Sequence, residues 1–365
     1  MSLCFAAACA AGEASPLTAT LVLEGSLRPG DPLLAWFWAP ASLEGGTAEL
    51  LDAAGKRLGA ARTFAMPAAY LAAAGLSPAP AAGLAPAAPA PAAGPAPAPA
   101  AATPAPAAAA PAPAAATERL YGILLALPLE AKPGACRLVV RGQVPAGGAA
   151  RRAFSAEAGL VVEPRTFISE DIPLDAANTA IRKEPDPKKE AEARALAELL
   201  ARVDADAVYL DAPFVLPVDA AARRSSTFGD ERRYLYASGG ADTSRHLGVD
   251  FAVVKGTPVR AAGRGRVVFA GQRIVTGTTL VIEHLPGLYS IYMHLAEASV
   301  QVGRLVQSGE IVGKSGNSGL STGPHLHWEL RAGGRAVDPD FLVARPPLDK
   351  ARLIATMATR SKGGD

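Results

Sequence analysis

Short apolar runs alternate with turn residues along most of this chain, and this pattern predicts a mainly β protein. The segments 18–23 and 33–38 flank a turn at Arg28-Pro29-Gly30-Asp31. Further runs rich in apolar, β-branched and aromatic residues occupy 120–127, 137–140, 158–162, 266–270, 279–283 and 289–293. Strands at short intervals between turns are typical of sandwiches and barrels. We therefore predict a small β-sandwich-like domain first and a compact antiparallel β-barrel or sandwich after it.

Turn residues divide the second half of the chain further. We expect turns at Gly256-Thr257-Pro258, at Leu285-Pro286-Gly287 and over residues 313–317, where glycine, proline and serine gather. One segment has a different periodicity. Leu196, Leu199, Leu200 and Val203 follow i, i+3, i+4, i+7 spacing, which favours a helix over about 186–203. Asp186 would be its N-cap, with Pro187 at the first helical position.

The chain also contains a segment of very different composition. Residues 71–117 are almost entirely Ala, Pro and Gly, and no charged residue lies between Arg62 and Glu118. Such a segment cannot bury enough apolar surface to fold, and its prolines favour an extended form. We expect a disordered insert within a β-domain of 17–165. A linker would follow over 166–213, then a second domain over 214–345 and a tail over 346–365.

Composition narrows the possible functions. The net charge is +2 and the basic residues are dispersed, which argues against a nucleic-acid partner. No apolar run reaches the ~20 residues of a transmembrane helix. Residues 1–16 include an apolar stretch with small residues, which is either a truncated secretory signal or an ordinary apolar terminus. Ala6-Ala7-Ala8-Cys9 within it is a weak lipoprotein-like site. Cys136 lies in an apolar run and is expected to be a small buried residue.

The five histidines all lie between residues 246 and 327. His246 and Asp250 are four apart in an extended-looking segment, and His325 and His327 are two apart, so each pair should share one strand face. A catalytic zinc site needs three protein ligands, an open position and a group that moves protons. The cluster offers two or three ligands and one or two such groups. The alternatives are a surface His–Asp pair and two structural histidines.

Two other histidines end strands. His294 closes the run 289–293, and by itself it could be a single structural histidine. His284 closes the preceding run beside the hairpin turn. We interpret His284 as a surface turn residue and leave it outside the site.

These residues carry a resemblance. From about 226 to 343, a third of the chain, the sequence resembles the catalytic domain of the M23 peptidase family, the LytM and lysostaphin-like zinc endopeptidases. The matching stretches are Phe228-Gly229-Asp230-Glu231-Arg232, His246-Leu247-Gly248-Val249-Asp250-Phe251, Gly256-Thr257-Pro258-Val259, Tyr292-Met293-His294-Leu295 and residues 321–329.

The resemblance implies roles for individual residues. His246, Asp250 and His327 would hold one Zn²⁺ ion, which would activate a water molecule. His325 would be the general base, and His294 would stabilise the oxyanion or assist proton transfer. The implied protein is an endopeptidase that cleaves the peptide stems or cross-links of peptidoglycan in the bacterial cell envelope, periplasmic or secreted. A groove tyrosine of the family could correspond to Tyr234 or Tyr236.

Two other functions and one hypothesis about control also remain open. The domain could be a catalytically idle wall-binding regulator of other murein hydrolases. It could also be a carrier-type barrel, since residues 300–313 resemble turns of biotinyl and lipoyl domains, but Lys314 lacks the flanking residues of such a carrier. A further hypothesis is that residues 169–210 lie across the groove and limit activity.

Overall fold

The computed structural model describes residues 17–23, 25–73, 76, 118–146, 149–210 and 212–361. The predicted signal segment 1–16 lies outside these residues, as does most of the predicted insert 71–117. At the start of that insert, Leu71 belongs to helix α1 (Ala68–Ala73) and is buried, and so is Leu76. The described chain is mainly β, as the apolar pattern predicts.

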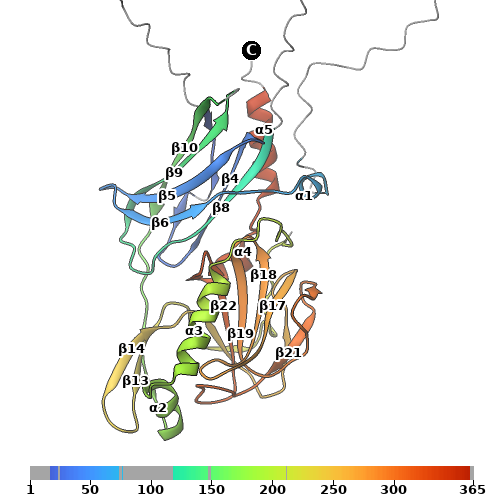
Figure 1. The fold of residues 1–365 in the computed structure, drawn as a ribbon. Coiled ribbons are helices and arrows are strands. Elements are labelled where there is room, and N and C mark those ends of the chain that lie inside the picture. Colours follow the sequence, from blue (N-terminus) through green and yellow to red (C-terminus); the bar gives the residue numbers. More distant parts are fainter. Residues whose placement is uncertain are drawn as a thin grey trace, which may run out of the picture.

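The N-terminal half contains two sheets (Figure 1). One has the order β1-β10-β9-β5-β6, with β3 paired to β10, and the other has the order β2-β4-β8-β7. Their strands are β1 (Leu17–Ala19), β2 (Val22–Leu23), β3 (Ser26–Leu27), β4 (Pro32–Pro40), β5 (Glu44–Asp52), β6 (Arg57–Arg62), β7 (Phe64–Ala65), β8 (Glu118–Ala126), β9 (Gly134–Pro145) and β10 (Arg151–Val162).

The two sheets share one apolar core. Phe37 from β4 stacks on Tyr121 of its own sheet and on Phe154 of the other, each at 5.6 Å between ring centroids. Such contacts between inner faces are those of a sandwich. Strands on either side of the predicted insert pair directly, Phe64 of β7 opposite Gly122 of β8.

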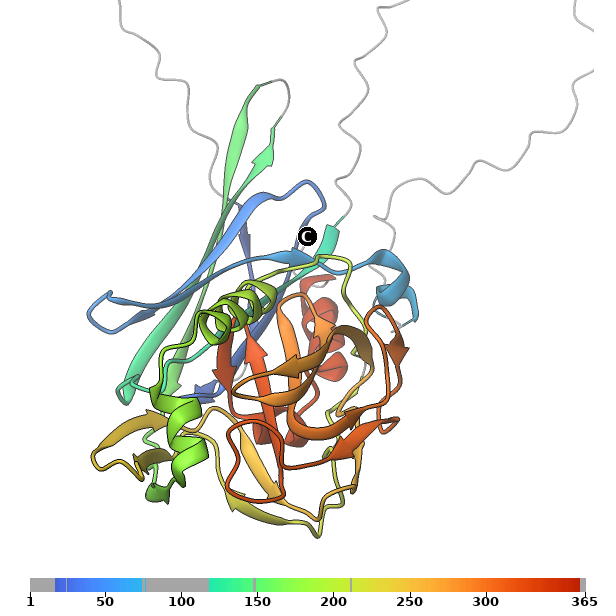
Figure 2. The ribbon, with the colours of Figure 1, turned by 60° about the horizontal axis from the view of Figure 1, so that its bottom comes forward.

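The C-terminal half contains a ten-stranded sheet with the main order β12-β15-β22-β19-β18-β17-β20 (Figures 1 and 2). The strands are β12 (Arg223–Ser226), β15 (Val249–Ala252), β16 (Pro258–Arg260), β17 (Gly265–Arg273), β18 (Gly277–Leu285), β19 (Leu288–Ala298), β20 (Leu305–Val306), β21 (Ile311–Ser315), β22 (Leu326–Ala332) and β23 (Arg335–Val337). Within the described part of the chain the strands do not close into a barrel, and the sandwich alternative fits.

The turn predicted over 313–317 is wrong in its first half. Residues 313–315 belong to β21, where Gly313 lies opposite Val259 and Ala298. A Cβ on Gly313 would lie 2.5 Å from the Glu297 carbonyl oxygen, so glycine serves close strand packing there. Lys314 is in the same strand and pairs with Glu297, away from any exposed hairpin tip.

The segment between the two large sheets wraps along the C-terminal one (Figure 1). Strand β11 (Ser169–Pro173) joins β13 (Glu231–Leu235) and β14 (Ala241–Arg245) in a small sheet, and α2 (Ala176–Lys183) follows. Helix α3 (Pro187–Leu200) begins as predicted, with the Asp186 side chain accepting bonds from the N–H groups of Lys188 and Lys189.

The end of α3 differs from the prediction. Leu196, Leu199 and Leu200 pack against Val281, Tyr289, Ile291 and Met293 of the sheet, but the helix stops at Leu200. Val203 lies beyond it and is half exposed. The Tyr289 hydroxyl donates to the Arg202 carbonyl at 2.8 Å. This bond holds the backbone in a non-helical conformation just before Val203, the last residue of the predicted apolar face.

The described part of the predicted tail over 346–365 contains a helix. Helix α5 (Lys350–Ser361) follows α4 (Pro339–Ala344), and Leu348 and Leu353 are buried. The Trp36 indole N–H donates to the Pro347 carbonyl at 3.0 Å. The C-terminal segment therefore packs on the N-terminal sandwich, a contact between distant parts of the sequence that no local pattern encodes.

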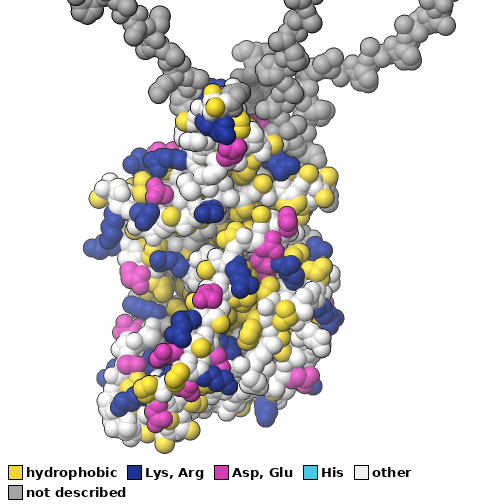
Figure 3. All heavy atoms as spheres, viewed as in Figure 1, with side chains coloured by type: hydrophobic (Ala, Val, Ile, Leu, Met, Phe, Trp, Pro, Cys, Tyr) yellow, Lys and Arg dark blue, Asp and Glu magenta, His cyan; other side chains and the backbone are white. Residues whose placement is uncertain are grey.

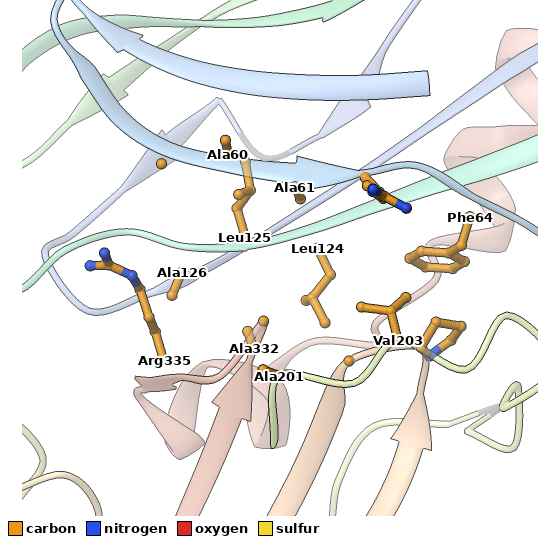
Figure 4. A pocket seen from close by; sticks show the side chains of 15 residues that line it. Ala60, Ala61, Phe64, Leu124, Leu125, Ala126, Ala201, Val203, Ala332 and Arg335 are labelled. Atoms are coloured by element: carbon orange, nitrogen blue, oxygen red, sulfur yellow. The ribbon is translucent and has the colours of Figure 1, made fainter. Parts of the chain in front are cut away.

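A cavity of about 350 Å³ between the two halves is lined largely by apolar side chains (Figure 4). Ala60, Ala61 and Leu124 face it from the sandwich, and Ala332 and Val203 from the other side. Arg165 forms ion pairs with both Asp31 and Asp338 and so joins the halves. On the face drawn in Figure 3, basic and acidic side chains are interspersed.

No described helix combines the length and apolar character needed to cross a membrane.

His284 is not the surface turn residue that the sequence suggested. It is fully buried, Nδ1 donates to the Arg264 carbonyl at 2.8 Å, and Nε2 lies 2.7 Å from the Ser290 hydroxyl. The segment that contains Tyr209 and Leu210 covers His284, because the backbone N–H groups of both residues donate to the His284 carbonyl. Burial lowers the pKa of His284 from 6.5 to about 4.

This burial predicts an acid-sensitive fold. Because the folded pKa lies below the unfolded value, the contribution of His284 to stability is present above pH 6.5 and is lost as the pH falls towards 4. Between pH 7 and pH 5 the loss from this group should be about 2 kcal/mol. Urea unfolding of the wild type and His284→Asn at both pH values measures it. An equal loss in the two proteins would contradict the assignment.

Candidate metal centre

Strands β15 and β22 bring the first two site residues together. They pair antiparallel with Asp250 directly opposite His327, so the carboxylate and the imidazole emerge on the same face. His246 precedes β15 and joins them from its end. Gly248 allows this approach, because a Cβ there would lie 2.3 Å from the Trp328 carbonyl oxygen.

The three side chains converge tightly. His246 Nε2 lies 3.0 Å from His327 Nδ1 and 3.2 Å from Asp250 Oδ1, and His327 Nδ1 lies 2.7 Å from the same carboxylate oxygen. One ligand atom from each of the three residues lies within 4.8 Å of the others, and all three residues are buried. Two imidazoles and one carboxylate are the donor set of many catalytic zinc sites.

The hydrogen bonds on the outer sides of the rings select the tautomers that a metal needs. A carbonyl can only accept, so His246 Nδ1 donates to the Thr227 carbonyl at 2.8 Å and its Nε2 keeps a lone pair. His327 Nε2 lies 2.9 Å from Glu329 Oε1, which leaves Nδ1 for the inner side. Partners of this kind fix ring orientation in metal sites. The residues present therefore fit a divalent metal ion.

The electrostatics of the cluster agree with this donor set. Burial opposes charge on Asp250, but His327 and His246 outweigh it and hold the pKa of Asp250 well below its usual range. Burial also opposes charge on His327, yet Asp250 and Glu329 raise the pKa of His327 to about 9. Asp250 is thus an anion ready to bind a cation, and a metal ion would displace the proton from His327.

His325 lies beside the ligands with a free ring nitrogen. It sits just before β22, bridged to Gly316, and its Nδ1 donates to the Gly323 carbonyl at 2.8 Å. Its Nε2 lies 3.9 Å from Asp250 Oδ1. Burial lowers the pKa of His325, so at neutral pH its Nε2 is a proton acceptor inside the site.

His294 has the only positive φ, 58°, of any described residue other than glycine. It lies within β19 rather than at the end of a strand, in a stretch where the β18–β19 pairing is irregular. Strained backbone of this kind costs about 1–3 kcal/mol and concentrates at functional sites. Its ring centroid lies 4.8 Å from that of His325.

The protonation of His294 bears on its two possible roles. Nδ1 donates to the Ser318 carbonyl at 2.8 Å, so Nε2 of the neutral ring can only accept. Burial, reinforced by His325 and His327, lowers the pKa of His294 to about 3. Donating to an oxyanion would require a second proton, which this environment disfavours. The geometry therefore agrees better with assistance in proton transfer.

A cavity of about 280 Å³ opens in front of the cluster. Tyr234 lines it, under the Arg182 guanidinium at 3.7 Å from the ring centroid, whereas Tyr236 does not. Part of the segment 169–210 also reaches the cavity, because Ile172, Leu174 and Arg182 line it. This segment is held there by Asn178, whose side chain bonds both the N–H and the carbonyl of Ser321 at 3.2 Å.

Sequence reasoning missed three charged residues behind the ligands. Glu329 bonds His327 and is itself paired with Arg331. Its spacing was a usable signal, because residues two apart on a strand share a face. Arg232 bonds Asp250, and Glu170 bonds Arg232 at 2.9 Å. No local spacing points to these last two.

Comparison with known sequences agrees with this geometry. Residues 244–339 match the sequence profile of Peptidase family M23. This stretch, called the M23 segment below, belongs to the family. The chain is similar to the DD-carboxypeptidase/endopeptidase Mpg of Neisseria meningitidis, with 39% identity over 118 residues. It is also similar to the peptidoglycan DD-endopeptidase ShyA of Vibrio cholerae, with 40% identity over 122 residues.

These sequence matches cover only part of each chain. The matches cover 32% and 33% of this chain, and 27% of Mpg and 28% of ShyA. This chain therefore spans little more than a quarter of either relative. Among solved structures, a candidate M23 peptidase from Pseudomonas aeruginosa is 21% identical and aligns over 87% of this chain and 94% of its own, with a TM-score of 0.48.

Proposed function

We propose that this protein is a zinc-dependent endopeptidase that hydrolyses peptide stems or cross-links of bacterial peptidoglycan, in the periplasm or outside the cell. The observation that carries the proposal is the convergence of His246, Asp250 and His327 beside a neutral His325 whose Nε2 faces the same point. The similarity to the peptidoglycan DD-endopeptidase ShyA, with 40% identity over 122 residues, supports the substrate class.

Zinc is the ion that this donor set suits best. Two imidazoles with one carboxylate and an open fourth position are typical of catalytic zinc, and no cysteine is among the described residues that line this site. When bound, zinc lowers the pKa of water towards 7 and polarises a peptide carbonyl. His246 and His327 would hold it through Nε2 and Nδ1, and Asp250 through a carboxylate oxygen.

The remaining residues would handle protons and the peptide. His325 would accept a proton at Nε2 as water attacks and return it to the departing amine, because one group can serve both steps. His294, beside His325 and accepting at Nε2, would assist this transfer. The cavity lined by Tyr234 and Thr276 would seat the peptide. A complete set of ligands and bases supports an enzyme over the idle-regulator alternative.

Metal removal tests the proposal directly. Dialysis against a chelator should abolish release of soluble peptides from purified peptidoglycan, and a stoichiometric amount of Zn²⁺ should restore it. Release is measured by mass analysis of the fragments, which also identifies the bond cleaved. Chelator already saturated with zinc is the control. Undiminished cleavage by the metal-free protein would contradict the mechanism, and no cleavage by the zinc-loaded protein would favour the idle regulator.

A further inference from the structure

A carboxylate from outside the M23 segment reaches the layer directly behind the candidate ligands. Glu170 lies in β11, and its Oε1 accepts from the Ser226 hydroxyl at 2.7 Å and from Arg232 Nε at 2.9 Å. The Ser226 hydroxyl in turn lies 3.2 Å from His246 Nδ1. Arg232 donates through Nη2 to Asp250. Glu170 therefore holds two groups that each contact a different candidate ligand.

The pairing of β11 with β13 determines which side chains face the site. These strands are parallel, with Glu170 opposite Arg232 and Asp171 opposite Arg233. Side chains alternate between the two faces of a sheet, so the two pairs point in opposite directions. Asp171 and Arg233 form an exposed ion pair at the surface, whereas the Arg232 side chain is only 15% exposed. One strand thus offers a test residue and a matched control.

Charge explains why Glu170 matters to a metal. Arg232 forms an ion pair with Asp250. A cation in this position competes with a metal ion for the Asp250 carboxylate. Glu170 takes the other side of the same guanidinium, so one arginine lies between two carboxylates. This arrangement leaves a net negative charge to offset a dication. With Glu170 neutralised, Arg232 and Asp250 would cancel, and the arginine would turn wholly towards Asp250.

We propose that Glu170 is a positioning residue of the metal centre: it restrains Arg232 so that Asp250 stays available to the metal, and it anchors Ser226 behind His246. This rests on the proposed function only in taking zinc as the ligand. Because Glu170 lies in β11, the metal affinity of the site would depend on a strand that precedes the M23 segment.

Zinc affinity of the full chain tests this without substrate. Competition with a chromogenic chelator should show about tenfold weaker zinc binding in Glu170→Gln, the low end of the effect of residues that support metal ligands. Glutamine keeps an oxygen for Ser226 but removes the charge. Asp171→Asn, on the other face of the same strand, should bind zinc like the wild type. Wild-type affinity in Glu170→Gln would overturn the proposal.

A second background separates positioning from general stability. In Arg232→Gln the competing cation is gone, so adding Glu170→Gln should weaken zinc binding by less than twofold. A full additive loss would overturn the proposal, because it would show that Glu170 does not act through Arg232. Glu170→Asp keeps the charge and should recover most of the affinity even if Glu170→Gln folds poorly; failure to recover any would also overturn it.

The result is independent of cleavage. If the wild-type protein binds zinc but releases no peptides from peptidoglycan, the proposed function fails while the order of zinc affinities can still hold. If cleavage is zinc-dependent but Glu170→Gln binds zinc normally, the positioning role fails and the function stands.

Discussion

Replacing Asp250 with alanine is expected to empty the metal site and to abolish peptidoglycan cleavage. Asp250 is the one anion among the three candidate ligands, and its carboxylate lies within 3.2 Å of both imidazoles. Its removal also leaves two imidazoles beside the buried Arg232 cation, which repels a metal ion. The metal contributes several kcal/mol to the reaction, so activity should fall by roughly 10³-fold or more.

Two measurements check this together. Metal content after dialysis should drop from one zinc per chain to none, and peptide release should drop with it. Asp206→Ala is the matched control, because Asp206 is an exposed aspartate that does not line the cavity. Full zinc content in the Asp250→Ala protein would show that this carboxylate is not a ligand.

Replacing His325 with alanine is expected to leave zinc in place and to slow the chemistry. Its Nδ1 is bonded to the Gly323 carbonyl and its Nε2 points at the site without being among the three converging ligand atoms. Loss of a general base typically costs about 10²–10⁴-fold in rate. We therefore expect kcat on a stem-peptide substrate to fall by that amount while zinc affinity changes by less than ~3-fold.

The contrast between the two variants separates ligand from base. Zinc content, kcat and KM are measured for His325→Ala and, as a matched histidine replacement away from the site, for His284→Asn. A loss of zinc from His325→Ala would make this residue a ligand instead. A kcat close to that of the wild type would remove it from the proton-transfer step.

The sequence predicted elements well where the signal was local. Strands β17, β18 and β19 contain the predicted runs 266–270, 279–283 and 289–293. The start of α3 was found because an Asp-Pro pair has a direct backbone reason to begin a helix. Its end was not, because the bond from Tyr289 to Arg202 comes from another part of the chain.

The candidate site was partly accessible in the same way. Spacings of two and four residues on extended segments place His246 with Asp250, and His325 with His327, from the sequence alone. Glu329 follows the same two-residue period and could have been included. His284 was misread because its burial depends on Tyr209 and Leu210 and on Arg264, none of them adjacent in sequence.

By itself, the sequence determined the mainly β character, the segment that resembles M23 peptidases and the set of side chains able to bind metal, because each depends on residue type and short-range periodicity. Only the tertiary structure decided which ring nitrogens face inward, that α5 packs on the N-terminal sandwich and that Glu170 stands behind the ligands through Arg232 and Ser226. The physical reason is that hydrogen bonds, burial and charge balance at the centre are set by strands that pair across long distances in the chain.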